Sequence, residues 1–126
     1  KTGFIKQARR VRKVFGGGMR QAGYLAAAGI YALENNLDLL AKDHLHAKQI
    51  ATALSTKDFI GKIMPVETNI IIFEVKDSYT PKTLCEKLAQ HDILCLSISA
   101  TQVRMVTHLD FTGEMLNKLL KVIDAM

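Results

Sequence analysis

Cysteine and proline are scarce in this sequence and tryptophan is absent, and the scarcity of cysteine excludes one class of protein. Cys85 and Cys95 are the only cysteines among 126 residues, and their spacing is not that of the CxxC motifs of zinc or redox sites. A disulfide-dense secreted scaffold is therefore excluded. Both cysteines lie in apolar segments, so we expect buried, reduced thiols rather than a disulfide or a metal pair. Reduced thiols are typical of the cytoplasm, which is the expected location.

The sequence also lacks a long apolar run. The longest stretch without a charged residue covers residues 21–33, whereas a membrane-spanning helix needs about 20 apolar residues. We therefore expect a buried helix here and no membrane partner. Hydrophobic residues make up 48% of the chain and charged residues 23%, which is the composition of a globular domain that can bury a core.

Acidic residues are missing from the first 20 positions, which hold seven of the 17 Lys and Arg residues. The net charge of +5 is therefore concentrated at one end of the chain. Such a local basic block is typical of a nucleic-acid surface, a phosphate site or a solvated helix face. Composition alone leaves these three alternatives open.

Glycine is concentrated at residues 16–18, directly after the basic block. No Gly-Lys-Ser/Thr follows, so the triplet is not a Walker motif, and Gln21 stands where a dinucleotide fingerprint has glycine. A helix that begins near Met19 would place its free N–H groups and Arg20 opposite Lys13. Lysine, arginine and backbone N–H groups together suit a phosphate. The stretch therefore predicts an anion site, with a solvated basic face as the alternative for Lys13.

Apolar spacing predicts three helices in the first part of the chain. The first ends at Gly16, the second covers residues 19–34, and the third covers residues 37–54 with Asn36 as its cap. Asp43, His44 and His46 fall within the third helix, where residues two apart point away from each other. We expect surface histidines there and no metal site.

Strands and helices then alternate. We expect strands at residues 61–66, 69–75, 93–98 and 102–107, the last two paired as a hairpin. Thr80 and Pro81 begin one helix between the strands. Thr112 begins the last helix, whose core-facing residues are expected to be Met115, Leu116, Leu119, Leu120 and Ile123. This order predicts an α+β fold: N-terminal helices, then a small, mainly antiparallel sheet with helices on one face.

Arg104 is a second candidate site residue because it interrupts the apolar segment 103–106. Alternation places Val103 and Met105 on one face and Arg104 on the opposite face. A buried unpaired charge is unfavourable, so a partner is expected, and a bound carboxylate is one candidate. The alternative is a solvent-exposed position on an edge strand. His108 and Asp110 follow, and we expect them to shape the turn into the last helix.

Two separated blocks carry a resemblance to a known family. Residues 8–23, ARRVRKVFGGGMRQAG, continued by residues 25–36, and residues 103–110, VRMVTHLD, resemble the L-threonine aldolases. The resemblance is looser between residues 55 and 100. It implies pyridoxal phosphate (PLP) as cofactor and an aspartate-aminotransferase-type fold, with residues 1–36 as the tail of the PLP-binding large domain and 37–126 as the small domain. It also implies a C-terminal part of the enzyme, inactive alone, because the family's Schiff-base lysine would lie upstream of Lys1.

The same resemblance assigns roles to three residues. It implies that Lys13 and Arg20 contact the PLP phosphate of the neighbouring subunit in a homodimer or homotetramer. Arg104 would hold the α-carboxylate of a substrate such as L-threonine or L-allo-threonine, which the enzyme cleaves to glycine and an aldehyde.

Two other functions are alternatives to the aldolase. A related PLP-dependent β-eliminating lyase could share the fold. A small basic nucleic-acid-binding module is the alternative from another class. Phe4 and Phe15 are the only aromatic residues in the basic segment, and both fall on its apolar side. The exposed rings typical of single-strand binders are therefore missing, and no nucleic-acid partner is expected.

Overall fold

A computed structural model describes all residues 1–126, and it divides into two compact units, Lys1–Leu37 and Asp38–Met126. The expected domain boundary, between residues 36 and 37, lies one residue from this division. The assignment of the first unit to the tail of a larger domain stays a prediction. No helix in the structure is both long and apolar enough to cross a membrane.

The first unit consists of helices α1, Thr2–Val14, and α2, Gly23–Asn35, and none of their residues is buried. Helix α1 ends just before Gly16, as the sequence predicts. Gly16 has φ of +81° and its N–H donates to the Lys13 carbonyl, while the Gly17 N–H donates to the Arg12 carbonyl at 2.8 Å. This pair of bonds is a Schellman motif, in which a left-handed glycine satisfies the last carbonyls of a helix.

The predicted start of the second helix near Met19 is wrong. Helix α2 begins at Gly23, with Ala22 as its N-cap, and residues 20–22 form a turn. Gln21 has φ of +51°, and a residue in this left-handed region cannot continue a right-handed helix. Arg20 therefore precedes the helix instead of lying within its first turn.

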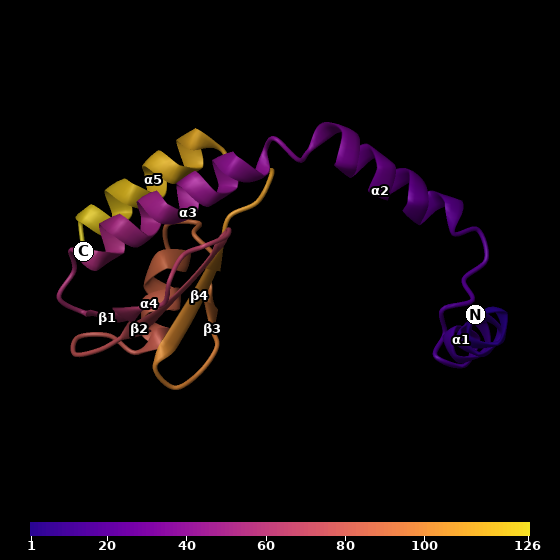
Figure 1. Ribbon diagram of the computed structural model, residues 1–126. Coiled ribbons are helices and arrows are strands. Elements are labelled where there is room, and N and C mark those ends of the chain that lie inside the picture. Colours follow the sequence, from indigo (N-terminus) through magenta and orange to yellow (C-terminus); the bar gives the residue numbers. More distant parts are fainter. The chain divides into compact units, whose positions relative to one another are not determined.

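The second unit contains a four-stranded antiparallel sheet in the order β1-β2-β4-β3 (Figure 1). The strands are β1, Ile60–Ile63; β2, Ile70–Val75; β3, Leu96–Ser97; and β4, Gln102–Val106. The predicted pairing of the last two strands is confirmed. Both β1 and β3 are shorter than expected, because β1 ends before Pro65 and the chain enters β3 only after residues 93–95. The strand β4 lies in the interior of the sheet, so the alternative that placed Arg104 on an edge strand is wrong.

Three helices cover one face of this sheet: α3, Leu40–Ser55; α4, Pro81–Ala89; and α5, Gly113–Asp124. Their buried side chains join those of alternate strand residues in a single core, in which Ile71 lies opposite Met105 and Phe73 opposite Val103. Figure 1 shows α3 and α5 running side by side over the strands. The predicted α+β class is confirmed.

Local capping rules succeed for two helices and fail for a third. Thr80 and Thr112 accept hydrogen bonds from the backbone N–H groups of Thr83 and Met115, as predicted. Asn36 does not cap α3, because α3 begins only at Leu40 and has no side-chain cap. In α5, Leu116, Leu119 and Ile123 are buried. Met115 is 52% exposed, so its predicted core position is wrong.

Candidate functional site

The glycine turn holds Lys13 against its own backbone. Lys13 lies in the last turn of α1, and a Cβ added at Gly18 would approach its Cδ to 2.5 Å and its Nζ to 2.8 Å. The hydrogen atom of Gly18 is therefore what allows the lysine side chain to lie across the turn. Gly17 is equally close to Arg12, whose Cγ would be 2.6 Å from an added Cβ. The triplet thus has one conformational role, at Gly16, and two steric ones.

Arg20 lies in the turn that follows the glycines, and its side chain is exposed. Neither Lys13 nor Arg20 belongs to any of the ion pairs of the chain. Two unpaired cations separated by a glycine turn can accept an anion without first breaking an internal salt bridge. The turn therefore retains the chemistry of an anion site, although the helix start that the sequence predicted for it is wrong.

Arg104 lies on the face of the sheet that the helices leave open, between Ile72 of β2 and Leu96 of β3. Val103 and Met105 are buried on the opposite face, which confirms the predicted alternation. Arg104 itself is half-buried, and its Nε is buried without any hydrogen-bond partner. The chain provides no acceptor for this donor, so it is available to an acceptor from outside the unit.

The three predicted site residues are divided between the two units. Lys13 and Arg20 belong to the first unit, and Arg104 belongs to the second. Each unit therefore carries at least one of these cations, none of which belongs to an ion pair of the chain. Each unit can thus bind an oxyanion. A phosphate and a carboxylate are the groups that suit them, because lysine offers a point charge and arginine a planar fork of donors.

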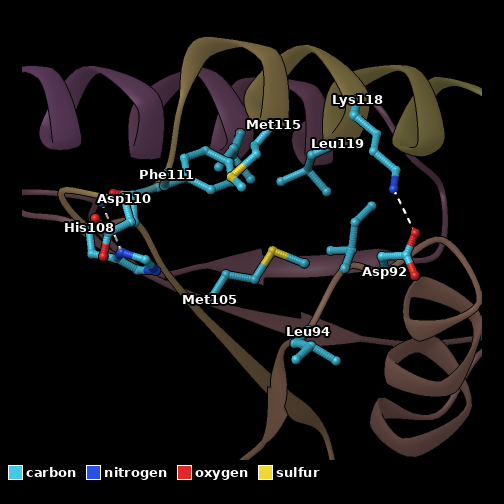
Figure 2. A pocket seen from close by; sticks show the side chains of 12 residues that line it. Asp92, Leu94, Met105, His108, Asp110, Phe111, Met115, Lys118 and Leu119 are labelled. Atoms are coloured by element: carbon cyan, nitrogen blue, oxygen red, sulfur yellow. Dashed lines mark hydrogen bonds and ion pairs between the residues drawn. The ribbon is translucent and has the colours of Figure 1, made fainter.

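A cavity of about 490 Å³, which the sequence did not predict, lies on the helix-covered side of the sheet. In Figure 2, Met105 of β4 and Leu119 of α5 extend into the same space, with Phe111 nearby. Polar side chains lie at its two ends. At one end, the Asp110 N–H donates to His108 Nδ1 at 3.3 Å, which confirms the expected role of these residues in the turn.

At the other end of the cavity, Lys118 Nζ lies 2.9 Å from Asp92 Oδ2. The hydrogen bond from Lys118, together with its charge, holds the pKa of Asp92 below its usual value. The rest of the lining is mostly apolar and presents no nucleophile or paired carboxylates. The cavity therefore suits the packing of an apolar group better than it suits catalysis.

The predicted surface position of His46 is wrong. Its ring is 6% exposed and packs edge-to-face on Phe111 at 5.8 Å, and Asp43 is also buried. Thr107 donates a hydrogen bond to the Asp43 carbonyl at 2.8 Å, so this part of α3 is attached to the end of β4. No three His, Cys, Asp or Glu side chains lie close enough together to hold a metal ion.

The two cysteines were expected to be buried. Both are half-buried free thiols, and their Sγ atoms lie 3.3 Å apart. Neither this contact nor the cavity has a local signal in the sequence, because each brings together segments that only the tertiary fold makes neighbours.

Comparison with solved structures identifies the fold. The chain is similar to the cystine C–S lyase C-DES, with a TM-score of 0.62 and 17% sequence identity over 82% of this chain and 28% of that one. At this identity the likeness shows the fold alone. The fold is thus one that a carbon–sulfur lyase also uses.

Comparison of sequences identifies the family. The profile of the beta-eliminating lyase family matches residues 1–78, and the chain belongs to this family. It is 42% identical over 114 residues to the low specificity L-threonine aldolase of Escherichia coli strain K12, and 38% identical over 112 residues to low-specificity L-threonine aldolase 1 of Arabidopsis thaliana. The matches cover 90% and 86% of this chain but only 32% and 31% of the two relatives. The chain therefore spans about a third of their length.

Proposed function

We propose that this chain acts as part of a PLP-dependent aldolase that cleaves L-threonine, L-allo-threonine and similar β-hydroxy-α-amino acids to glycine and an aldehyde. The observation that carries the proposal is Arg104, a half-buried arginine whose Nε has no partner, in a chain 42% identical to a low specificity L-threonine aldolase. Membership of the beta-eliminating lyase family implies the PLP cofactor and does not fit a nucleic-acid-binding module.

Arg104 would bind the α-carboxylate of the amino acid. A guanidinium can donate two parallel hydrogen bonds to a carboxylate, which fixes the rotation of the bound molecule as well as its position. That orientation decides which bond at Cα is aligned for cleavage. PLP, when bound, supplies the electron sink for the bond that breaks, so the task of the protein is to bind and orient the substrate.

Lys13 and Arg20 would hold the phosphate of the cofactor, and we propose that this cofactor belongs to the neighbouring subunit of a homodimer or homotetramer. Their exposed positions and lack of internal ion pairs support the assignment. The Gly18 position supports it as well, because a side chain there would displace Lys13. The lysine that bonds to PLP would come from outside this chain, which would then be inactive by itself. The free thiols support a location in the cytoplasm.

The test uses the natural full-length gene product supplied with PLP. We expect a visible absorption band that borohydride removes, and we expect glycine and acetaldehyde in equal amounts from L-threonine. Peptide mapping should then place the reduced cofactor on a lysine outside residues 1–126. A protein without the band would contradict the cofactor, and a labelled lysine within this chain would contradict the proposed inactivity.

A β-eliminating lyase is the second candidate, because the matching family carries that description. Such an enzyme would release a β-substituent and leave a keto acid and ammonia instead of glycine. Product analysis with a β-substituted amino acid beside L-threonine separates the two reactions. Keto acid formation without glycine would favour the lyase over the aldolase.

A further inference from the structure

Cys85 and Cys95 lie on two elements that the fold brings together. Cys85 is in the middle of α4, and Cys95 directly precedes β3, the strand that flanks β4 at the edge of the sheet. Helix α4 packs against β3. These are the only two cysteines among residues 1–126, so a disulfide within this part of the chain must join this pair.

Their sulfur atoms lie 3.3 Å apart, and the Cys95 thiol donates a weak hydrogen bond to the Cys85 sulfur. A disulfide needs about 2.0 Å between the sulfurs, so the remaining approach is comparable to a small side-chain rotation. Burial raises the pKa of Cys95 to about 12, and the contact with Cys85 adds to this rise. Cys95 therefore remains protonated, and Cys85, which accepts its hydrogen bond, is the better placed attacking sulfur.

Both cysteines are half-buried, so neither is sealed inside the core. The fold thus keeps the two sulfurs close to each other at a position that is not fully buried.

We propose that Cys85 and Cys95 form a thiol–disulfide exchange site that closes to an intramolecular disulfide when it meets a low-molecular-weight disulfide. The Cys85 thiolate attacks one sulfur of the small disulfide, forms a mixed disulfide and releases one thiolate. That thiolate takes the Cys95 proton, and the Cys95 sulfur then attacks Cys85 and releases the second thiolate. Two protein thiols are oxidised and one small disulfide is reduced to two thiols. An excess of reduced thiol reverses the steps.

The bond would attach the segment before β3 to α4. Leu96 of β3 pairs with Arg104 of β4, so closure restrains the strand beside that arginine. The proposal rests on the geometry of the two thiols and not on the proposed function, so failure of either leaves the other standing.

The test is to equilibrate the chain with mixtures of reduced and oxidised glutathione, trap it with an alkylating agent, and map it by mass spectrometry. We expect the wild type to lose two hydrogen atoms, with Cys85 and Cys95 cross-linked and without a lasting glutathione adduct. Cys85→Ser and Cys95→Ser should instead each retain one glutathione on the remaining cysteine. The same equilibration in denaturant measures how much the fold favours the disulfide. We expect the equilibrium constant for disulfide formation to be at least about 10-fold smaller in the denatured chain.

Three outcomes would overturn the proposal. The wild type could accumulate glutathione adducts as the single variants do, it could form disulfides between molecules, or it could remain reduced under conditions that oxidise the denatured chain. Circular dichroism of the Ser variants shows whether they are folded. The native-versus-denatured comparison of the wild type does not depend on them.

Discussion

At the scale of single residues, two side-chain nitrogens of the second unit are buried without a hydrogen-bond partner, His46 Nδ1 and, on strand β4, Arg104 Nε. Its strand is interior, so its Nε is buried, and no group of the chain accepts a hydrogen bond from it. A buried donor without an acceptor is unfavourable by about 1–3 kcal/mol. A carboxylate bound to Arg104 would supply the missing acceptor. The free energy recovered in this way would add to the affinity for that carboxylate.

Arg104→Lys tests this role in the full-length enzyme. The charge is retained but the two-pronged donor is lost, so we expect KM for L-threonine to rise roughly 10- to 100-fold. Gln102→Ala is the matched control, since Gln102 lies on the same strand and face. Steady-state kinetics of aldehyde release measure both. An unchanged KM in Arg104→Lys would contradict carboxylate binding.

Gly18→Ala tests the glycine turn at the same scale. The added methyl group would lie 2.5 Å from Lys13 Cδ, so the lysine must move away, while the backbone need not. We expect a PLP dissociation constant roughly 10-fold higher, since one charge-assisted contact is weakened, with little change in thermal stability. Gly23→Ala is the control, because a Cβ there meets nothing within 4 Å. Equal effects of the two substitutions would refute a specific role for Gly18.

At the scale of elements, the features predictable from the sequence are those that depend on near neighbours. Thr80 and Thr112 cap their helices through bonds to residues three positions on, and the alternation of Val103, Arg104 and Met105 describes both faces of β4. The start of α2 is not predictable in this way, because the residue type of Gln21 does not indicate its left-handed backbone.

Features set by distant contacts were not predictable in this way. The two-residue length of β3, the burial of His46 against Phe111 and the cavity beside Met105 each depend on segments that only the tertiary fold brings together. For the candidate site, the sequence indicated the residue types and the anion chemistry. It did not indicate that Arg104 is interior to the sheet.

The cap of α4 gives a prediction at this scale. Thr80 accepts from the Thr83 N–H, and Thr83 returns a bond to the Thr80 N–H. Thr80→Ala leaves the Thr83 N–H without its side-chain acceptor, while the N–H at position 80 can still donate to Thr83 Oγ1, and we expect the substitution to lower the free energy of unfolding by about 1 kcal/mol. Thr52→Ala, at an exposed position inside α3, should be nearly neutral. Urea unfolding compares them, and equal losses would exclude a capping role.

At the scale of the whole molecule, the hydrophobic core lies entirely in the second unit. Every buried apolar residue falls between Ala47 and Ile123, and the first unit buries none. Residues 38–126 should therefore fold alone, with a cooperative urea transition and a free energy of unfolding of about 5–10 kcal/mol. A gradual, non-cooperative transition would show that the core needs residues 1–37.

Subunit mixing tests the proposed placement of Lys13 across a subunit boundary. Full-length Lys13→Ala and Arg104→Ala subunits should each be nearly inactive. In a mixed dimer, one site would combine Arg104 of one subunit with Lys13 of the other and be intact. Co-expression should therefore restore roughly a quarter of wild-type activity for random pairing in a two-fold dimer. No recovery in isolated mixed dimers would place both residues in the same subunit's site.

The two edges of the sheet also affect how the protein behaves at high concentration. β3 has only two residues, and β1 has four with an irregular register between Ile60 and Ile63. A long, flat edge presents a row of free backbone groups on which another chain can add as a strand. Here each edge strand is too short or too irregular for a strand of another chain to add to it. The second unit should therefore remain dispersed under conditions in which a longer border would seed fibrils.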